Sequence, residues 1–144
     1  MDGRLTSRMK ALVFLVIAGM LPVGLHAQVP NVQLDAYQGK GYQPCEPSIA
    51  MSPLDPNVVV AGSILDNVYT SQDAGKTWTK AKLTSKYGVF GDPCVVPSPT
   101  GDFYYLHLSD PKGEGWSSEH LLDRIVCQHS QDGGKSWSKG GGMG

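Results

Sequence analysis

Short apolar runs separated by turn-forming residues dominate the chain after residue 45. In its first half the runs cover Ser48–Met51, Val58–Ala61 and Asn67–Thr70, and a fourth is expected over Trp78–Leu83. Their β-branched and aromatic residues suit a pleated, half-buried surface. Pro, Gly, Asp and Asn residues, which interrupt strands, lie between them. This half therefore predicts four short antiparallel strands.

The second half repeats this pattern with one interruption. Strands are expected over Cys94–Val96, Phe103–Leu108 and Arg124–His129, with a fourth beginning at Trp137. The segment Ser109–Leu121 lacks the strand pattern and is interpreted as an insertion. No stretch after residue 27 shows a helical period. The 18 Gly and 10 Pro residues also favour frequent turns over long helices. The sequence therefore predicts an all-β fold.

Two internal repeats relate the two halves. Residues 71–80 read SQDAGKTWTK and residues 130–139 read SQDGGKSWSK, with seven of ten positions identical. Upstream, EPSIAMSP at 46–53 aligns with DPCVVPSP at 92–99. The repeats define a lead-in at 28–45 and two units at 46–90 and 91–144. Four short strands repeated every ~40–60 residues are typical of β-propeller blades.

The ten-residue repeat has the chemistry of a constrained turn. Asp73 and Asp132 can accept backbone N–H groups, and Gly75 and Gly134 can adopt positive φ. The following Trp covers the turn with a large apolar face and starts the next strand. The residues expected to have this structural role are Ser71, Asp73, Gly75, Trp78, Ser130, Asp132, Gly134 and Trp137.

The motifs SQDAGKTW and SQDGGKSW resemble the Asp-box, or BNR repeat, of sialidase-like propellers. The resemblance implies that each box joins the third and fourth strands of a blade, on the rim away from the active site. It also implies a ring of about six blades. We therefore expect two four-stranded blades of an incomplete sialidase-like propeller, with the remaining blades outside this chain. The alternative is a ring built from several copies of a two-blade chain.

The first 27 residues predict a secretory signal peptide. Arg4, Arg8 and Lys10 precede the apolar run Ala11–Leu21, and the small residue Ala27 suits a cleavage site. We therefore expect a secreted or periplasmic protein. No apolar run reaches the ~18 residues of a membrane helix, so no span is expected in the mature chain.

Charge and cysteine content restrict the classes of partner and the disulfides that the chain can form. The net charge of -1 disfavours nucleic acid, whose binders carry basic patches. Cys45, Cys94 and Cys127 allow at most one disulfide within the chain, and their spacing does not select a pair. No metal site and no cofactor are expected.

Glu46 and Asp92 are the candidate catalytic residues. Each directly precedes a proline at equivalent positions of the repeat. If these segments begin the innermost strands, both carboxyl groups face the same axial mouth. A carboxyl pair can divide acid and base roles or hold a hard cation. In the alternative interpretation, each carboxylate only caps the entry of its strand.

Trp116 and Arg124 are the candidate substrate-binding residues. Trp116 lies in the acidic, glycine-rich insertion and can stack on a sugar ring or pack back on the blade. Arg124 is the only arginine after residue 27, and it can clamp a carboxylate or neutralise Asp123. The resemblance implies three substrate-clamping arginines, the first of them ahead of the first Asp-box. This chain has no arginine between Gln28 and Ser71.

Two functions follow from these observations. One is a sialidase-like exo-glycosidase acting on sialylated or related extracellular glycans, as the resemblance implies. The other is a non-catalytic propeller module that binds glycans or proteins, as the missing early arginine suggests. We expect an extracellular glycan as a partner in either case.

Overall fold

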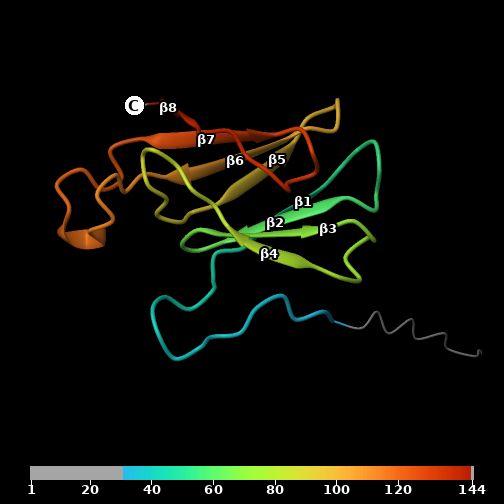
Figure 1. The fold of residues 1–144 in the computed structure, drawn as a ribbon, viewed down its shortest axis with the longest axis horizontal. Coiled ribbons are helices and arrows are strands. Elements are labelled where there is room, and N and C mark those ends of the chain that lie inside the picture. Colours follow the sequence, from blue (N-terminus) through green and yellow to red (C-terminus); the bar gives the residue numbers. More distant parts are fainter. Residues whose placement is uncertain (1–30, 144) are drawn as a thin grey trace, which may run out of the picture. The chain divides into compact units, whose positions relative to one another are not determined.

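The computed structural model describes residues 31–143, and Val32 onward forms one compact unit. Its strands form two antiparallel sheets of four, each in sequence order (Figure 1). The first sheet contains β1 (Ser48–Met51), β2 (Val59–Ser63), β3 (Asn67–Ser71) and β4 (Thr79–Lys82). The second contains β5 (Cys94–Pro97), β6 (Phe103–Leu108), β7 (Ile125–Ser130) and β8 (Gly141–Met143). The all-β prediction is confirmed.

The strand predictions hold closely except at the end of the second unit. The fourth strand was expected to start at Trp137, but β8 begins at Gly141. The Trp137 side chain instead packs against the core. The Ser109–Leu121 insertion carries a single turn of 3-10 helix, η1 (Gly115–Ser117). Within residues 31–143 no helix has the length and apolar character to cross a bilayer. The predicted signal peptide lies outside the described residues.

The repeat lets each sheet be divided into equivalent faces. Side chains alternate along a strand, and directly paired residues share a face. The strand registers define face A. Its residues include Ser48, Ala50, Val60, Gly62, Val68 and Thr70 in the first sheet, and Cys94, Val96, Tyr104, Leu106, Cys127 and His129 in the second. The opposite side, face B, carries Val59, Ala61, Asn67 and Tyr69 in the first sheet, and Val95, Phe103, Tyr105, Val126 and Gln128 in the second.

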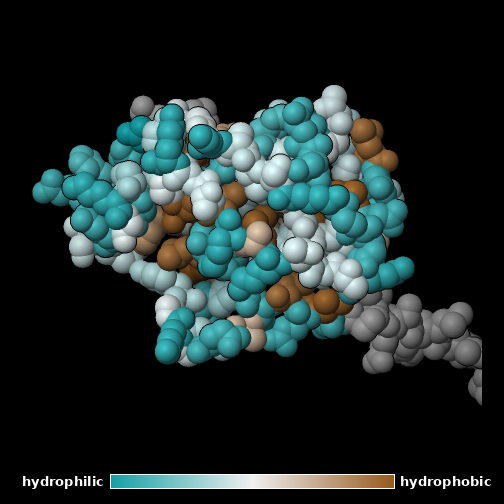
Figure 2. Space-filling model, in the orientation of Figure 1, coloured by the Kyte–Doolittle hydropathy of each residue, from teal (hydrophilic) through white to brown (hydrophobic). Residues whose placement is uncertain are grey.

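Face A of the first sheet packs on face B of the second. The buried core joins residues of both, and its largest fully buried members are Phe103 and Tyr105. Tyr105 reaches across so closely that a Cβ at Gly62 would lie 2.4 Å from its hydroxyl. The backbone N–H of Val95 donates to Ser48 Oγ at 2.9 Å and links β5 to β1. In Figure 2 the apolar surface still visible is broken into patches among hydrophilic side chains. The two sheets are therefore stacked head to tail.

Each copy of the ten-residue repeat, here called a box, joins the third and fourth strands of its sheet, and the two have matching hydrogen bonds. In the first, Asp73 accepts from Thr77 N at 2.8 Å and Thr77 Oγ1 at 2.6 Å, while Gly75 N donates to Ser71 Oγ at 2.8 Å. Trp78 Nε1 donates to Gly75 O at 2.9 Å. The second box repeats these contacts among Ser130, Asp132, Gly134, Ser136 and Trp137.

The hydrogen bonds of the first box hold the pKa of Asp73 at about 2, with the Thr77 hydroxyl contributing most. For Asp132 burial acts in the opposite direction, but the Ser136 hydrogen bonds outweigh it and leave the pKa at about 2. These carboxylates accept bonds within their own turns. Their role in the fold is that of a turn scaffold.

Candidate functional site

Glu46 and Asp92 occupy equivalent places at the entries of β1 and β5. Both are exposed, and both adopt positive φ, 52° and 46°. This left-handed backbone is uncommon outside glycine, and it recurs at both strand entries. The carboxyl group of Asp92 lies close enough to that of Glu46 to raise its pKa through a hydrogen bond. The structure thus brings together the pair that the repeat singled out.

The contact between the two carboxyl groups changes the chemistry of Glu46. Hydrogen bonding to Asp92 raises the pKa of Glu46, with smaller contributions from desolvation and charge repulsion. The physical reason is that two adjacent carboxylates repel one another, whereas a shared proton links them. The pair can therefore hold a proton under conditions where an isolated glutamate is ionised.

An aromatic row lies at the same end of the sheets. Phe90, two residues before Asp92, meets the ring of Tyr42 edge-on at 6.4 Å and that of Trp116 at 5.5 Å. Phe90 is buried, but Trp116 is 74% exposed and Tyr42 is 53% exposed. Trp116 therefore packs back through one edge and still presents a ring surface on which a ligand can stack.

Asp110 fixes the insertion loop that carries Trp116. It is only 6% exposed, and its carboxylate accepts from Gly113 N at 3.1 Å and Gly115 N at 2.9 Å. The backbone of Gly88 passes so close to Asp110 that a Cβ there would lie 1.8 Å from the carbonyl oxygen. The base of the loop is therefore tied to the turn between the two sheets, and η1 has a defined position.

Arg124 is engaged by its neighbour Asp123. The guanidinium donates twice to this carboxylate, with Nη2 to Oδ2 at 2.6 Å and Nε to Oδ1 at 3.0 Å. Ser109 Oγ adds a third bond to Asp123 at 2.6 Å. Arg124 chiefly, and then Ser109, lower the pKa of Asp123 to about 2. The guanidinium also lies over the Tyr87 ring, 5.1 Å from its centre. A bidentate clamp on a ligand would require Arg124 to leave Asp123.

The two strand histidines and the three cysteines form no further cluster with the acid pair. His107 is buried and bonds to Leu108 O at 2.8 Å and to Gln128 at 3.0 Å. His129 meets Asp102 at 2.9 Å on face A. Cys45, Cys94 and Cys127 are free thiols. Among the described residues, no three His, Cys, Asp or Glu side chains are grouped to hold a metal ion.

Sequence reasoning missed Tyr42 and Phe90. Both lie in segments without a repeat partner or a recognisable motif, so no motif pointed to them. A usable hint was the distance in sequence: Phe90 precedes Asp92 by two positions, and Tyr42 precedes Glu46 by four. Aromatic residues next to both members of a repeated acidic pair were therefore visible in the sequence.

The chain was compared with family models, curated proteins and solved structures, and none of these comparisons finds a match.

Proposed function

We propose that this chain forms two blades of a secreted or periplasmic, sialidase-like β-propeller protein that binds an extracellular glycan. Two neighbouring sheets with equivalent Asp-boxes are stacked head to tail, and repetition of such an interface generates a ring when the rotation closes. The observation that carries the proposed site is the contact between Glu46 and Asp92, which are contributed by equivalent positions of the two sheets.

The chemistry of this end suits a sugar. Carboxyl groups accept hydrogen bonds from sugar hydroxyls, and a protonated carboxyl also donates one. Trp116, which packs against Phe90 two residues before Asp92, adds an exposed apolar ring. Ligand sites commonly combine such an aromatic surface with a few converging polar groups.

The separation of the carboxyl groups favours binding over hydrolysis. Glycosidases place their two carboxyl groups about 5 Å apart when retaining and roughly 6.5–9.5 Å apart when inverting. Glu46 and Asp92 lie close enough for a hydrogen bond to raise the pKa of Glu46, which is closer than either of these arrangements. Arg124 is paired with Asp123 rather than directed at a ligand.

Hydrolysis remains the second candidate because of the raised pKa of Glu46. A general acid needs a carboxyl group that keeps its proton near the working pH. In this reaction Glu46 would protonate the glycosidic oxygen, and Asp92 would have to move away to act as base or nucleophile.

A glycan array followed by calorimetry tests the binding proposal. Binding should be lost in Asp92→Asn and weakened about tenfold or more in Trp116→Ala, equivalent to ~1.4 kcal/mol. Glu119→Gln, a change of an exposed carboxyl in the same insertion, is the matched control and should bind normally. A fluorogenic sialoside distinguishes the two candidates, because turnover that disappears in Glu46→Gln would establish hydrolysis. Equal binding by all variants would refute the site.

A further inference from the structure

Face B of the first sheet is covered by residues 32–45, which we call the cover segment. Tyr69, Ala61 and Asn67 on this face are at most 5% exposed. Asp35 is the anchor of the cover segment: its carboxylate accepts from Tyr69 OH at 2.6 Å and pairs with Lys80. Lys80 contributes most, and Tyr69 next, to lowering the pKa of Asp35 to about 2. The cover segment thus covers face B of the first sheet, whereas face B of the second sheet is covered by the first sheet.

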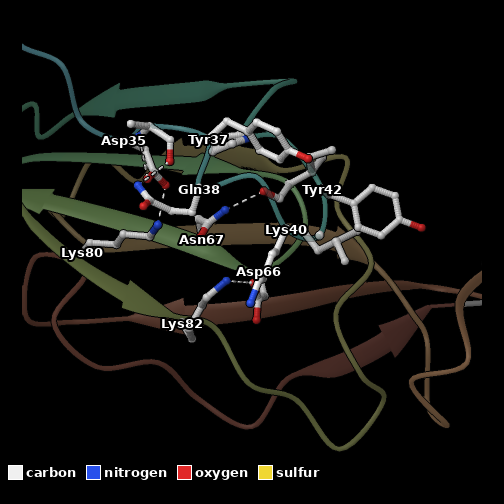
Figure 3. Close-up of a pocket in the computed structure, with 14 residues that line it drawn as sticks. Asp35, Tyr37, Gln38, Lys40, Tyr42, Asp66, Asn67, Lys80 and Lys82 are labelled. Carbon is white, nitrogen blue, oxygen red and sulfur yellow. Dashed lines mark hydrogen bonds and ion pairs between the residues drawn. The ribbon is translucent and has the colours of Figure 1, made fainter.

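The fit of the cover segment is poor compared with the sheet interface. Two hollows of about 390 Å³ and about 200 Å³ lie along it and are lined jointly by the cover segment and the first sheet. Figure 3 shows the larger hollow, where Lys80 pairs with Asp35 of the cover segment and Lys82 pairs with Asp66. Asn67 Oδ1 is buried there without a hydrogen-bond partner among the described residues. The sheet interface instead buries Phe103 and Tyr105 completely.

Face A of the second sheet is the complementary open surface. Val96 is 42% exposed and Tyr104 is 37% exposed, and the exposed thiol of Cys94 lies beside them. The equivalent residues of the first sheet, Ser48, Ala50 and Val60, are those that face the second sheet. Face A is therefore packed against another sheet in the first sheet and exposed in the second.

On the two free faces the large and small side chains are exchanged relative to the interface inside the chain. Inside the chain, small Gly62 on face A lies under large Tyr105 on face B. The equivalent positions on the free faces are large Leu106 on face A and small Ala61 on face B. A second pair shows the same exchange. In the core, Val60 on face A is small and Phe103 on face B is large, whereas the equivalent Tyr104 on face A is large and Val59 on face B is small. Exchange of large and small partners preserves the volume that a packed interface requires.

We propose that face A of the second sheet docks on face B of the first sheet of another copy of this chain, displacing the cover segment. The contact is head to tail, as it is within the chain, so successive copies form a closed ring or a filament. Release of the cover segment frees Asp35 for solvent, while Tyr69 OH keeps Ser63 Oγ at 3.1 Å. The proposal needs no glycan, and it rests on the same head-to-tail stacking of sheets that the proposed function uses.

Sedimentation velocity over a concentration series, with the chain from residue 28 onward, tests this. Asp35→Ala loosens the cover segment and should tighten self-association by about tenfold, equivalent to ~1.4 kcal/mol. Val96→Lys on the open face should abolish the association, alone and combined with Asp35→Ala. Leu54→Lys is the matched control, because Leu54 is 67% exposed in the β1–β2 turn and lies on neither face.

Circular dichroism checks that each variant is folded, and Tyr104→Lys replaces Val96→Lys if the latter is not. An Asp35→Ala chain that stays monomeric throughout the series overturns the proposal. Association that persists in the open-face variants also overturns it. Association lost equally in Leu54→Lys would show nonspecific apolar contact and would overturn it as well.

Discussion

Gly134 of the second ten-residue box lies against Val60 of the first sheet, and a Cβ at Gly134 would be 2.7 Å from Val60 Cγ2. The box is therefore more than a local turn, because its glycine also contacts the neighbouring sheet. At Gly75, the equivalent glycine of the first box, the atoms nearest to an added Cβ belong to Trp78, at 3.5 Å and beyond. The two glycines have nearly the same φ, 85° and 83°.

This pair of glycines gives a matched test of sheet packing. Gly75→Ala should cost about 1 kcal/mol of unfolding free energy, because alanine is strained at positive φ. Gly134→Ala should cost about 1–3 kcal/mol more, since its methyl group also meets Val60 and Thr70. Urea denaturation measures both. Equal losses would mean that the second box does not touch the first sheet.

Tyr105 should contribute a hydrogen bond across the sheets as well as its ring. Its hydroxyl donates to Asn67 O at 3.2 Å within the core. Tyr105→Phe should lower the free energy of unfolding by about 1 kcal/mol, the usual value for one such bond. Tyr104→Phe, on the open face of the same strand, should have almost no effect on stability. A larger loss in Tyr104→Phe than in Tyr105→Phe would mean that Tyr104, and not Tyr105, faces the core.

His107 predicts a pH dependence of stability. Burial lowers the pKa of His107, so the folded protein keeps it neutral at pH values where the unfolded chain is protonated. The unfolded chain then binds more protons as the pH drops through about 6.5, and stability falls in that direction. In chemical denaturation from pH 7 to pH 5, His107→Gln should flatten this slope. An unchanged slope in the variant would contradict the buried, neutral assignment.

The carboxyl contact can be tested by titration of Glu46. In Asp92→Asn the pKa of Glu46 should fall, because the shared proton and the charge repulsion are both removed. NMR detection of the side-chain carboxyl carbon during a pH titration measures the value directly. A Glu46 pKa that is the same in both proteins would show that the two groups do not meet.

The sequence predicted most of the fold because the information was local and repeated. Strand β6 was predicted with its correct ends, since Phe103–Leu108 combines β-forming residues with polar breakers on both sides. The Asp-boxes were interpretable because a few residue types determine the turn. The start of β8 was misplaced, since Trp137 leaves the strand direction to bond to Gly134 and pack on the core.

The site was predictable only in part. The repeat paired Glu46 with Asp92, but the positive φ that lets their side chains meet was not encoded in a glycine or a motif. The cover segment was also missed. Its contact between Asp35 and Tyr69 joins residues far apart in sequence, and no pattern specifies which face such a segment will cover.

The head-to-tail arrangement of the two sheets is tested most directly by long-range NMR contacts. Nuclear Overhauser effects should connect the Tyr105 ring to the Gly62 α-protons, and the Gly134 α-protons to the Val60 methyl groups. Their presence, together with cross-strand contacts within each sheet, is the predicted result. Intact cross-strand contacts without these two connections would show that the sheets form but do not stack in this way, and would contradict the account.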